Sequence, residues 1–500
     1  MSSYYIKSFL WTTVAKILKA IVNFISIPLL IGLWGKENYG VLSLALACNG
    51  YLNILDLGIN TGAVKHYSEW RAKGNYDKIR NVVSSNNVFY LGISTLNIIG
   101  LASIALFGEK LFNLTHEEFH SLKLCLLILA LFSTPQWLTT TYNQLLIAYE
   151  RFAYTQKVQS IIILLQALLI ISMIQFKLNM TTYFLLLTAL TASVLIPYIY
   201  YCLKNNLIDR IRIAFYWKDF KPVLVYSLSI FALSIFQMTA AYSRPVILGI
   251  FGNSTSEIVA DYRIIEVVPL FIMMLGGTLS SIFLPKTSEL MAKGNIESIR
   301  QFAYNGTIIT TILANALCVP FILGASTFLT LYVGHEYLYL EKWLILFCVI
   351  TLFQVHTTPG NSLILAKGKT RALVVTSAIA CVLSIILNAC LCKLFNAGAA
   401  VIGYTLYIVI VISSYYFIYY KKILNLEKKK IFISFFYPTS LSLISILIVC
   451  LLSNILQIDN TVGILWGTVV IIFCWFTIFF VLLLLFRIIK LKNKHITIGY

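Results

Sequence analysis

Charged side chains are scarce in this chain of 500 residues. Only 11% of its residues are Asp, Glu, Lys or Arg, whereas soluble domains carry about 25%. A soluble chain of this length would fold as about two or three domains, each with a charged surface. The sequence has too little charge to cover them. The composition therefore excludes a soluble enzyme, a secreted domain and a disordered chain, and it favours a polytopic helical membrane protein.

The sequence also lacks recognisable metal, disulfide and nucleotide motifs. Its ten cysteines include no CxxC pair and no Cys/His cluster, so we expect reduced, apolar side chains and no metal site. GKT occurs at 368–370, but Leu363 stands where a P-loop requires glycine. No cofactor is predicted. The apolar run from Phe9 to Trp34 is too long for a signal peptide and no A-x-A site follows it, so we expect it to remain as the first membrane helix.

Long apolar segments make up most of the chain, which is 59% hydrophobic and has a mean hydropathy of +0.85. A spanning helix needs about 20 predominantly apolar residues. This rule predicts an all-α membrane protein with fourteen spans. The predicted spans are residues 9–35, 39–65, 82–107, 121–148, 156–176, 182–203, 222–251, 257–284, 302–332, 341–366, 371–394, 399–420, 431–456 and 461–486.

The distribution of Lys and Arg indicates the orientation of these spans. The net charge is +19, from 38 basic and 19 acidic residues. If the N-terminus lies in the cytoplasm, the inner segments hold 28 of the basic residues, the outer segments hold 6, and four lie within spans. Cytoplasmic loops of membrane proteins are enriched in Lys and Arg. The excess of positive charge therefore indicates topology and not a nucleic-acid partner, and both termini are predicted to be cytoplasmic.

Two loops share a sequence repeat. Residues 68–80 read SEWRAKGNYDKIR, residues 288–300 read SELMAKGNIESIR, and eight of the thirteen positions are identical at an offset of 220. A weaker similarity relates LLIAYERF (145–152) to LILAKGKT (363–370). Six predicted spans separate the copies, so the two halves run in the same direction. The predicted organisation is an N-terminal six-helix bundle (1–205), a second bundle (206–420), and helices 13 and 14 with a cytoplasmic tail (421–500).

These features resemble a known superfamily. The number of spans, the two six-helix halves and the A-x-G-[ND] loop after spans 2 and 8 are similar to the multidrug/oligosaccharidyl-lipid/polysaccharide (MOP) exporters. The stretch from Leu52 to Arg80, with NILDLGIN and AVKHYSEWRAKGN, resembles the second-helix-to-loop segment of bacterial O-antigen flippases of the Wzx type. This resemblance covers essentially the whole chain.

The resemblance implies a non-enzymatic function. Flippases of this type move undecaprenyl-diphosphate-linked oligosaccharide repeat units from the cytoplasmic to the periplasmic leaflet of the bacterial inner membrane, for O-antigen and lipopolysaccharide assembly. It also implies alternating access in a V-shaped bundle, with a cavity lined chiefly by spans 1, 2, 7 and 8. The implied partners are the lipid-linked oligosaccharide, membrane lipids, a polysaccharide polymerase and a chain-length regulator.

Polar side chains lie within those same four spans. An ionisable group costs at least ~2.5–3.5 kcal/mol at the centre of a bilayer and usually faces a cavity. In spans 1 and 2 the spacing of the polar residues places them on one helix face. The residues are Thr12, Lys16, Lys19, Asn23 and Ser26 in span 1, Asn49, Asn53, Asp56 and Asn60 in span 2, Ser227, Ser234, Gln237 and Arg244 in span 7, and Asp261, Arg263 and Glu266 in span 8.

Lys and Arg are the residue types that bind phosphate, so these spans predict a site for the diphosphate and its sugars. The predicted substrate-binding residues are Lys16, Lys19, Asn23, Asn53, Gln237, Arg244 and Arg263. The predicted ion-coupling residues are Asp56, Asp261 and Glu266.

Structural roles compete with these assignments. The two lysines of span 1 can extend to the cytoplasmic headgroups. Arg263 and Glu266 are three residues apart and can pair with each other. Asp56 can neutralise one of the span 1 lysines instead of binding an ion.

Three other functions fit parts of the sequence. A lipid II flippase differs only in the headgroup that it carries. A multidrug antiporter would favour buried carboxylates in an aromatic pocket, whereas these spans hold four cations against three carboxylates. A polymerase or membrane glycosyltransferase needs a long outer loop, and the longest outer segment, 109–120, is short.

Overall fold

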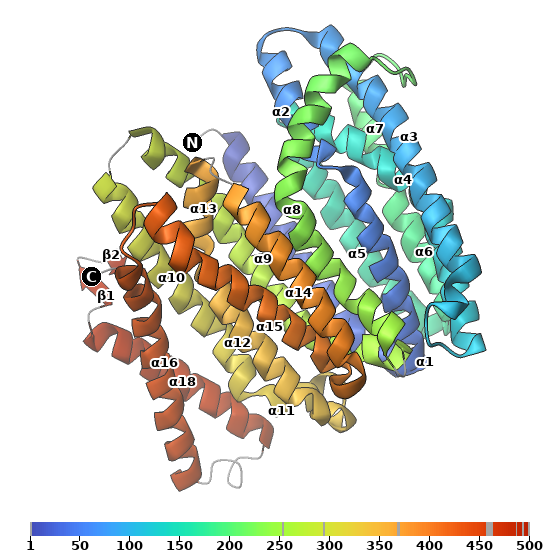
Figure 1. Ribbon diagram of the computed structural model, residues 1–500. Helices are drawn as coiled ribbons and strands as arrows, with labels where there is room; N and C mark the ends of the chain where they lie inside the picture. Colours follow the sequence, from blue (N-terminus) through green and yellow to red (C-terminus); the bar gives the residue numbers. More distant parts are fainter. Residues whose placement is uncertain are drawn as a thin grey trace. The chain divides into compact units, whose positions relative to one another are not determined.

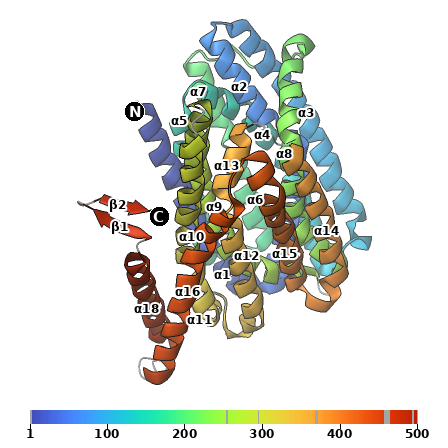
Figure 2. The same cartoon turned by 60° about the vertical axis from the view of Figure 1, so that its left-hand side comes forward.

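A computed structural model describes residues 3–252, 255–293, 296–367, 371–456, 464–486, 488–492 and 495–498. This part of the chain is almost entirely helical (Figure 1), and the predicted all-α membrane class is confirmed. A short antiparallel hairpin near the C-terminus was not predicted. It pairs Ile489 with Ile498 and follows α18 (Figure 2).

The first half of the chain contains nine α-helices and two short 3-10 helices within the described residues. They are α1 (Ser3–Leu52), η1 (Asn53–Asp56), α2 (Ile59–Ala72), α3 (Tyr76–Phe107), η2 (Gly108–Lys110), α4 (His116–Ala148), α5 (Phe152–Phe176), α6 (Met180–Ala192), α7 (Leu195–Lys204), α8 (Trp217–Phe251) and α9 (Thr255–Lys293).

The second half continues the helical pattern. Its elements are α10 (Ile296–Leu323), α11 (Ala325–Tyr332), η3 (His335–Leu340), α12 (Glu341–Val355), α13 (Thr358–Lys367), α14 (Arg371–Phe395), α15 (Ala397–Ser414), the π-helix η4 (Tyr415–Ile423), α16 (Lys428–Leu456), α18 (Ile464–Leu485), β1 (Ile489–Lys492) and β2 (His495–Ile498).

Eleven helical segments among the described residues are long and apolar enough to cross a membrane, so the protein is multi-pass. One of them, Val14–Asp56, covers most of the first two predicted spans. The helices α8 and α9 are not among the eleven, although their 35 and 39 residues exceed the length of a span. The number fourteen stays a prediction, and residues 461–463 of the last predicted span lie outside the described residues.

Gly35 divides the long helix α1 into two arms. An unbroken α-helix of 50 residues would be about 75 Å long, far more than the ~30 Å of the hydrocarbon core. At Gly35 the backbone leaves the helical region, with φ 84° and ψ 164°. A positive φ is readily available to glycine because it has no Cβ. The predicted end of the first span at residue 35 therefore coincides with the break.

The second predicted span, residues 39–65, is not one continuous helix. The chain passes from α1 through η1 and then turns at two left-handed residues, Leu57 (φ 51°) and Gly58 (φ 72°), before α2 begins. A left-handed leucine is uncommon and strained. The apolar run hid this break, because hydropathy does not distinguish a helix from an interrupted one.

Packing divides the chain into two compact units. The first comprises Met1–Tyr262 with Asn388–Ala400, and the second comprises Arg263–Leu387 with Val401–Tyr500. In the first unit α1 packs against α4, α5 and α8, and α3 packs against α4 (Figure 1). In the second unit α10 packs against α12, α13 and α16. The predicted domains 1–205, 206–420 and 421–500 rest on the sequence repeat and stay a prediction.

The repeat is visible in the helix boundaries. Helices α3 and α10 begin at Tyr76 and Ile296, at the same place in the two copies of the loop motif. Helices α5 and α14 each have 25 residues and begin 219 residues apart, at Phe152 and Arg371. Each of these two helices is followed by a left-handed residue, Lys177 (φ 48°) or Asn396 (φ 49°). Gly294 and Asn295 of the second loop motif lie outside the described residues.

Helix α2 packs closely against α8 through two glycines. Gly58 and Gly62 are four residues apart, and a Cβ added at Gly62 would lie 2.0 Å from Ser227 Oγ and 3.1 Å from the carbonyl oxygen of Val223. A Cβ added at Gly58 would lie 2.9 Å from the carbonyl oxygen of Ser227. Small residues at this spacing allow membrane helices to approach each other closely. This contact fixes α8, which carries Gln237 and Arg244.

Candidate functional site

The first arm of α1 presents three of the predicted substrate-binding residues. Lys16 is half-buried, and Lys19 and Asn23 are exposed. Apolar side chains of the same arm, such as Ile17 and Ile21, are exposed as well. The carbonyl oxygen of Asn23 accepts a hydrogen bond from Ser26 Oγ at 2.9 Å. Lys19 and Asn23 are therefore accessible on this arm. The side chain of Thr12 lies outside the described residues.

Asp56 ends the 3-10 helix η1 and accepts its hydrogen bonds from uncharged groups. Tyr90 Oη donates to Asp56 Oδ1 at 2.7 Å, and the backbone N–H of Asn60 donates to Asp56 Oδ2 at 3.5 Å. Asn53, at the start of η1, is exposed. Asp56 is therefore held in place by Tyr90 of α3, and its hydrogen-bond geometry identifies no basic partner.

A buried polar network extends from Asp56 into the first unit. Gln144 Nε2 donates to Tyr90 Oη at 2.8 Å, and Asn86 Nδ2 donates to Gln144 Oε1 at 3.0 Å. Asn86 Nδ2 also donates to Tyr67 Oη at 2.8 Å. Sequence reasoning missed this network, because Asn86 and Gln144 lie in predicted spans 3 and 4, outside the polar stripes that were singled out. Buried hydrogen-bonded networks of this kind fix side-chain geometry.

Arg244 is buried within α8. Its side chain is only 7% exposed, and its Nη1 donates to Tyr262 Oη at 3.3 Å. Gln237, two turns earlier on the same helix, is exposed, and Ser227 is buried against α2. The side chain of Ser234 lies outside the described residues. The arginine is thus a buried cation in a predicted membrane helix, a position that usually has a functional reason.

Asp261 near the start of α9 forms an ion pair with Lys36. The Nζ of Lys36 lies 2.9 Å from Asp261 Oδ1 and 3.8 Å from Glu257 Oε2. Lys36 was predicted only as an outer-loop charge, and its partner is 225 residues away in the sequence. Close by, Asn113 Nδ2 donates to the carbonyl oxygen of Gly252 at 2.9 Å, and Ser256 Oγ donates to Glu118. These contacts connect the start of α9 to α1 and α4.

Arg263 and Glu266 form the ion pair that their spacing allowed. Arg263 Nη1 lies 2.7 Å from Glu266 Oε2, and the side chains are 24% and 7% exposed. The two residues belong to the second unit, whereas Arg244 and Asp261 belong to the first. Of the three predicted ion-coupling acids, Asp261 and Glu266 are therefore paired with cations, and Asp56 is hydrogen-bonded to neutral groups.

The described residues contain no group of three or more His, Cys, Asp or Glu side chains that could hold a metal ion. The predicted binding positions carry polar and cationic side chains. They comprise two lysines on α1, a buried arginine on α8, and amide side chains on α1, η1 and α8. Such groups can bind an anionic, hydroxyl-rich ligand.

Similarity to known proteins agrees with this chemistry. Residues 5–291, from α1 to α9, match the family of polysaccharide biosynthesis proteins. This range includes every predicted site residue. The uncharacterized membrane protein EpsK of Bacillus subtilis is 23% identical over 322 residues. The match covers 62% of this chain and 61% of EpsK.

Solved structures share the fold at low sequence identity. The structure of the lipid II flippase MurJ, in an inward closed conformation, superposes with a TM-score of 0.72 at 14% sequence identity. The match covers 96% of this chain and 99% of the MurJ chain. An inward-facing multidrug resistance transporter of the MATE family superposes with a TM-score of 0.65 at 14% sequence identity. That match covers 82% of this chain and 96% of the transporter. The chain therefore belongs to the polysaccharide biosynthesis protein family, and it has the fold of the flippases and transporters of the MOP superfamily.

Proposed function

We propose that this chain flips undecaprenyl-diphosphate-linked oligosaccharide repeat units from the cytoplasmic to the periplasmic leaflet by alternating access. The observation that carries the proposal is the family match over residues 5–291, because this region contains all the membrane-embedded cations of the candidate site. Its setting is the bacterial inner membrane, with both termini in the cytoplasm. Its product feeds surface polysaccharide assembly such as O-antigen, where a polymerase and a chain-length regulator act next.

The proposed division of labour follows the chemistry of the side chains. Lys16, Lys19 and Arg244 bind the diphosphate, since charge-assisted hydrogen bonds to phosphate are the strong ones. Asn23, Asn53 and Gln237 donate to and accept from sugar hydroxyls. Arg263, which pairs with Glu266, is the fourth cation proposed to bind the diphosphate.

Asp56 is the best of the three acidic residues for coupling to an ion gradient. Its hydrogen bonds come from a tyrosine hydroxyl and from backbone N–H groups, so gain of a proton or a cation does not break a hydrogen-bonded ion pair. Asp261 and Glu266 would each have to give up a basic partner.

Asp56→Asn should abolish dependence of export on the ion gradient at normal protein level. If export by Asp56→Asn still depends on the ion gradient, Asp56 is not the coupling residue. Asp77→Asn, which changes an exposed aspartate, is the control.

A lipid II flippase is the second candidate, because the MurJ structure covers 96% of this chain and lipid II carries the same lipid diphosphate. Mass spectrometry of lipid-linked saccharides in a strain that lacks this chain distinguishes the two. Accumulation of oligosaccharide repeat units on undecaprenyl diphosphate supports the proposal. Accumulation of lipid II favours the second candidate. Drug sensitivity without either lipid would indicate a multidrug antiporter, and long polymer made by the purified protein would indicate an enzyme.

A further inference from the structure

The connection between α7 and α8 is an ordered, extended segment that lies along α3. Ser84 Oγ accepts from the backbone N–H of Ala214 at 2.8 Å and donates to its carbonyl oxygen at 2.9 Å. Ser85 Oγ accepts from the backbone N–H of Tyr216 at 2.8 Å. Asn87 Nδ2 donates to the carbonyl oxygen of Arg212 at 3.1 Å. These bonds fix the backbone, and therefore the side on which each side chain lies.

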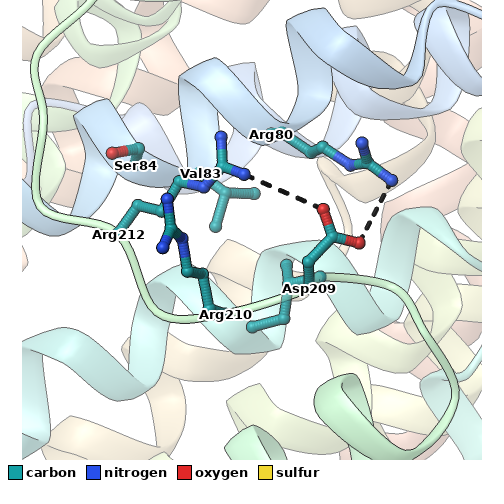
Figure 3. Close-up of a pocket in the computed structure, with 7 residues that line it drawn as sticks. Arg80, Val83, Ser84, Asp209, Arg210 and Arg212 are labelled. Carbon is teal, nitrogen blue, oxygen red and sulfur yellow. Dashed lines mark hydrogen bonds and ion pairs between the residues drawn. The ribbon is translucent and has the colours of Figure 1, made fainter.

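Three arginines line a pocket at this segment, and two of them pair with the carboxylate of Asp209 (Figure 3). Arg80 Nη2 lies 3.2 Å from Asp209 Oδ1, and Arg212 Nη2 lies 3.9 Å from Asp209 Oδ2. Arg210 is exposed beside them, and Arg80 also lies 3.8 Å from the exposed Asp77. The arginine side chains line an open pocket with Val83, Ser84 and Ile208. Three guanidinium groups exceed the negative charge of the two carboxylates, so the pocket is electropositive.

The same segment exposes a row of large apolar side chains. Ile211, Ile213, Phe215 and Trp217 occupy alternate positions and are 50%, 68%, 47% and 52% exposed. In an extended chain alternate residues lie on one side, so Ile211, Ile213 and Phe215 lie opposite Arg210 and Arg212. Trp217 follows as the first residue of α8. Phe215 and Trp217 stack with their ring centroids 6.1 Å apart. One side of the segment is thus apolar and aromatic, and the other is basic.

We infer that residues 208–217, together with Arg80, form a binding site for anionic phospholipids of the cytoplasmic leaflet. The segment connects two membrane helices, and its side of the protein is predicted to be cytoplasmic, so it lies at the level of the lipid headgroups. Aromatic side chains favour this interface, and arginine binds phosphate in a bidentate manner. The four apolar side chains insert beside the headgroup whose phosphate the arginines bind. None of the residues proposed to bind the transported lipid takes part.

Native mass spectrometry of the purified full-length protein tests this site, with phosphatidylglycerol and phosphatidylcholine of equal chain length as probes. The wild type should prefer phosphatidylglycerol. Arg210→Gln/Arg212→Gln should lower the affinity for phosphatidylglycerol by roughly 10-fold or more, because both arginines line the proposed phosphate pocket and each basic residue near the phosphate adds to the attraction. Lys421→Gln/Lys422→Gln removes the same charge from an exposed cytoplasmic position and should bind as the wild type does.

The source of the phosphate is tested separately. Ile213→Ser/Phe215→Ser should weaken binding of phosphatidylglycerol, and inorganic phosphate at equal concentration should not displace the lipid. Unchanged binding by the arginine variant, or a wild type with no preference between the two lipids, would overturn the inference. Displacement by inorganic phosphate with full binding by the apolar variant would indicate a site for a free anion instead. If the double arginine variant does not fold, the single variant Arg210→Gln, at an exposed position, is compared with the wild type for phosphatidylglycerol affinity instead.

Discussion

Lys36 Nζ lies 2.9 Å from Asp261 Oδ1, so the residue immediately after the α1 break is paired with a carboxylate in the first turns of α9. The Asp261 side chain is only 7% exposed and Lys36 is 22% exposed. Removal of one member of a buried pair leaves an uncompensated charge in a site of low dielectric. The ion pair therefore links the start of the second arm of α1 to α9.

We predict that Lys36→Ala destabilises the protein by about 3 kcal/mol, at the low end of the range for breaking a buried pair. The double variant Lys36→Ala/Asp261→Asn should be more stable than Lys36→Ala, because it also removes the charge of the buried Asp261 carboxylate and leaves only the half-exposed Glu257 without the lysine. Thermal unfolding in detergent measures both. Lys73→Ala is the matched control, because it removes an ion pair of similar distance, 2.6 Å, between exposed side chains, and such pairs contribute about 0–1 kcal/mol. Equal loss in the two lysine variants would contradict the prediction.

The close contact between α2 and α8 gives a second prediction. Gly62→Ala should lower the unfolding temperature and the yield, because the new methyl group would lie 2.0 Å from Ser227 Oγ. Gly92→Ala in α3 is the control, since its Cβ would meet no atom within 4 Å and alanine favours a helix over glycine by about 1 kcal/mol. Ser227→Gly should partly rescue Gly62→Ala. Full stability of Gly62→Ala would show that the two helices are not in this contact.

The Arg263–Glu266 pair allows binding and structural roles to be separated. If the pair is structural, Arg263→Ala should lower the protein level, and Arg263→Gln/Glu266→Gln should recover both level and function. If Arg263 also binds the diphosphate, the double variant should reach normal level without recovery of export. With the pair at 2.7 Å, we expect recovery of level in the double variant. Surface glycan measured at matched expression then decides whether export recovers.

The orientation of the spans is a fourth prediction. It rests on the 28 to 6 distribution of basic residues between inner and outer segments, because positively charged loops stay in the cytoplasm. Fusions to a reporter that distinguishes cytoplasm from periplasm provide the measurement. Reversed signals at any two positions would contradict the predicted order of the spans. Cytoplasmic signals are expected after residues 75, 210, 295 and 425, and periplasmic signals after residues 115, 179 and 337.

The sequence predicted the features that depend on local pattern. The apolar runs predicted membrane helices, the first span was expected to end at Gly35, and the spacing of Arg263 and Glu266 allowed the pair that the structure contains. Helices α3 and α10 begin at equivalent places in the two copies of the loop motif, at Tyr76 and Ile296. Each of these features follows from a pattern that is read along the sequence, without knowledge of how the helices pack.

The features that escaped prediction depend on contacts between distant segments. Nothing near Lys36 in the sequence indicates a partner at Asp261, and a single Asn or Gln in an apolar span gives no sign of its hydrogen-bond partner. The network from Tyr67 through Asn86 and Gln144 exists only once α2, α3 and α4 have packed. The left-handed turn at Leu57 was likewise invisible to hydropathy.

We propose that cations of α1 and α8 bind the diphosphate of a transported lipid-linked oligosaccharide. The most direct test of this proposal is transbilayer movement of that lipid in proteoliposomes, detected by a membrane-impermeant lectin, for the wild type and for Lys19→Ala and Arg244→Ala. Loss of a charged hydrogen bond costs about 1.5–3 kcal/mol, or roughly a 10- to 150-fold loss of affinity. We expect the wild type to expose the lipid-linked sugar to the lectin. Both variants should do so far more slowly at substrate concentrations below saturation. Movement at the wild-type rate in both variants, or none with the wild type, would contradict it.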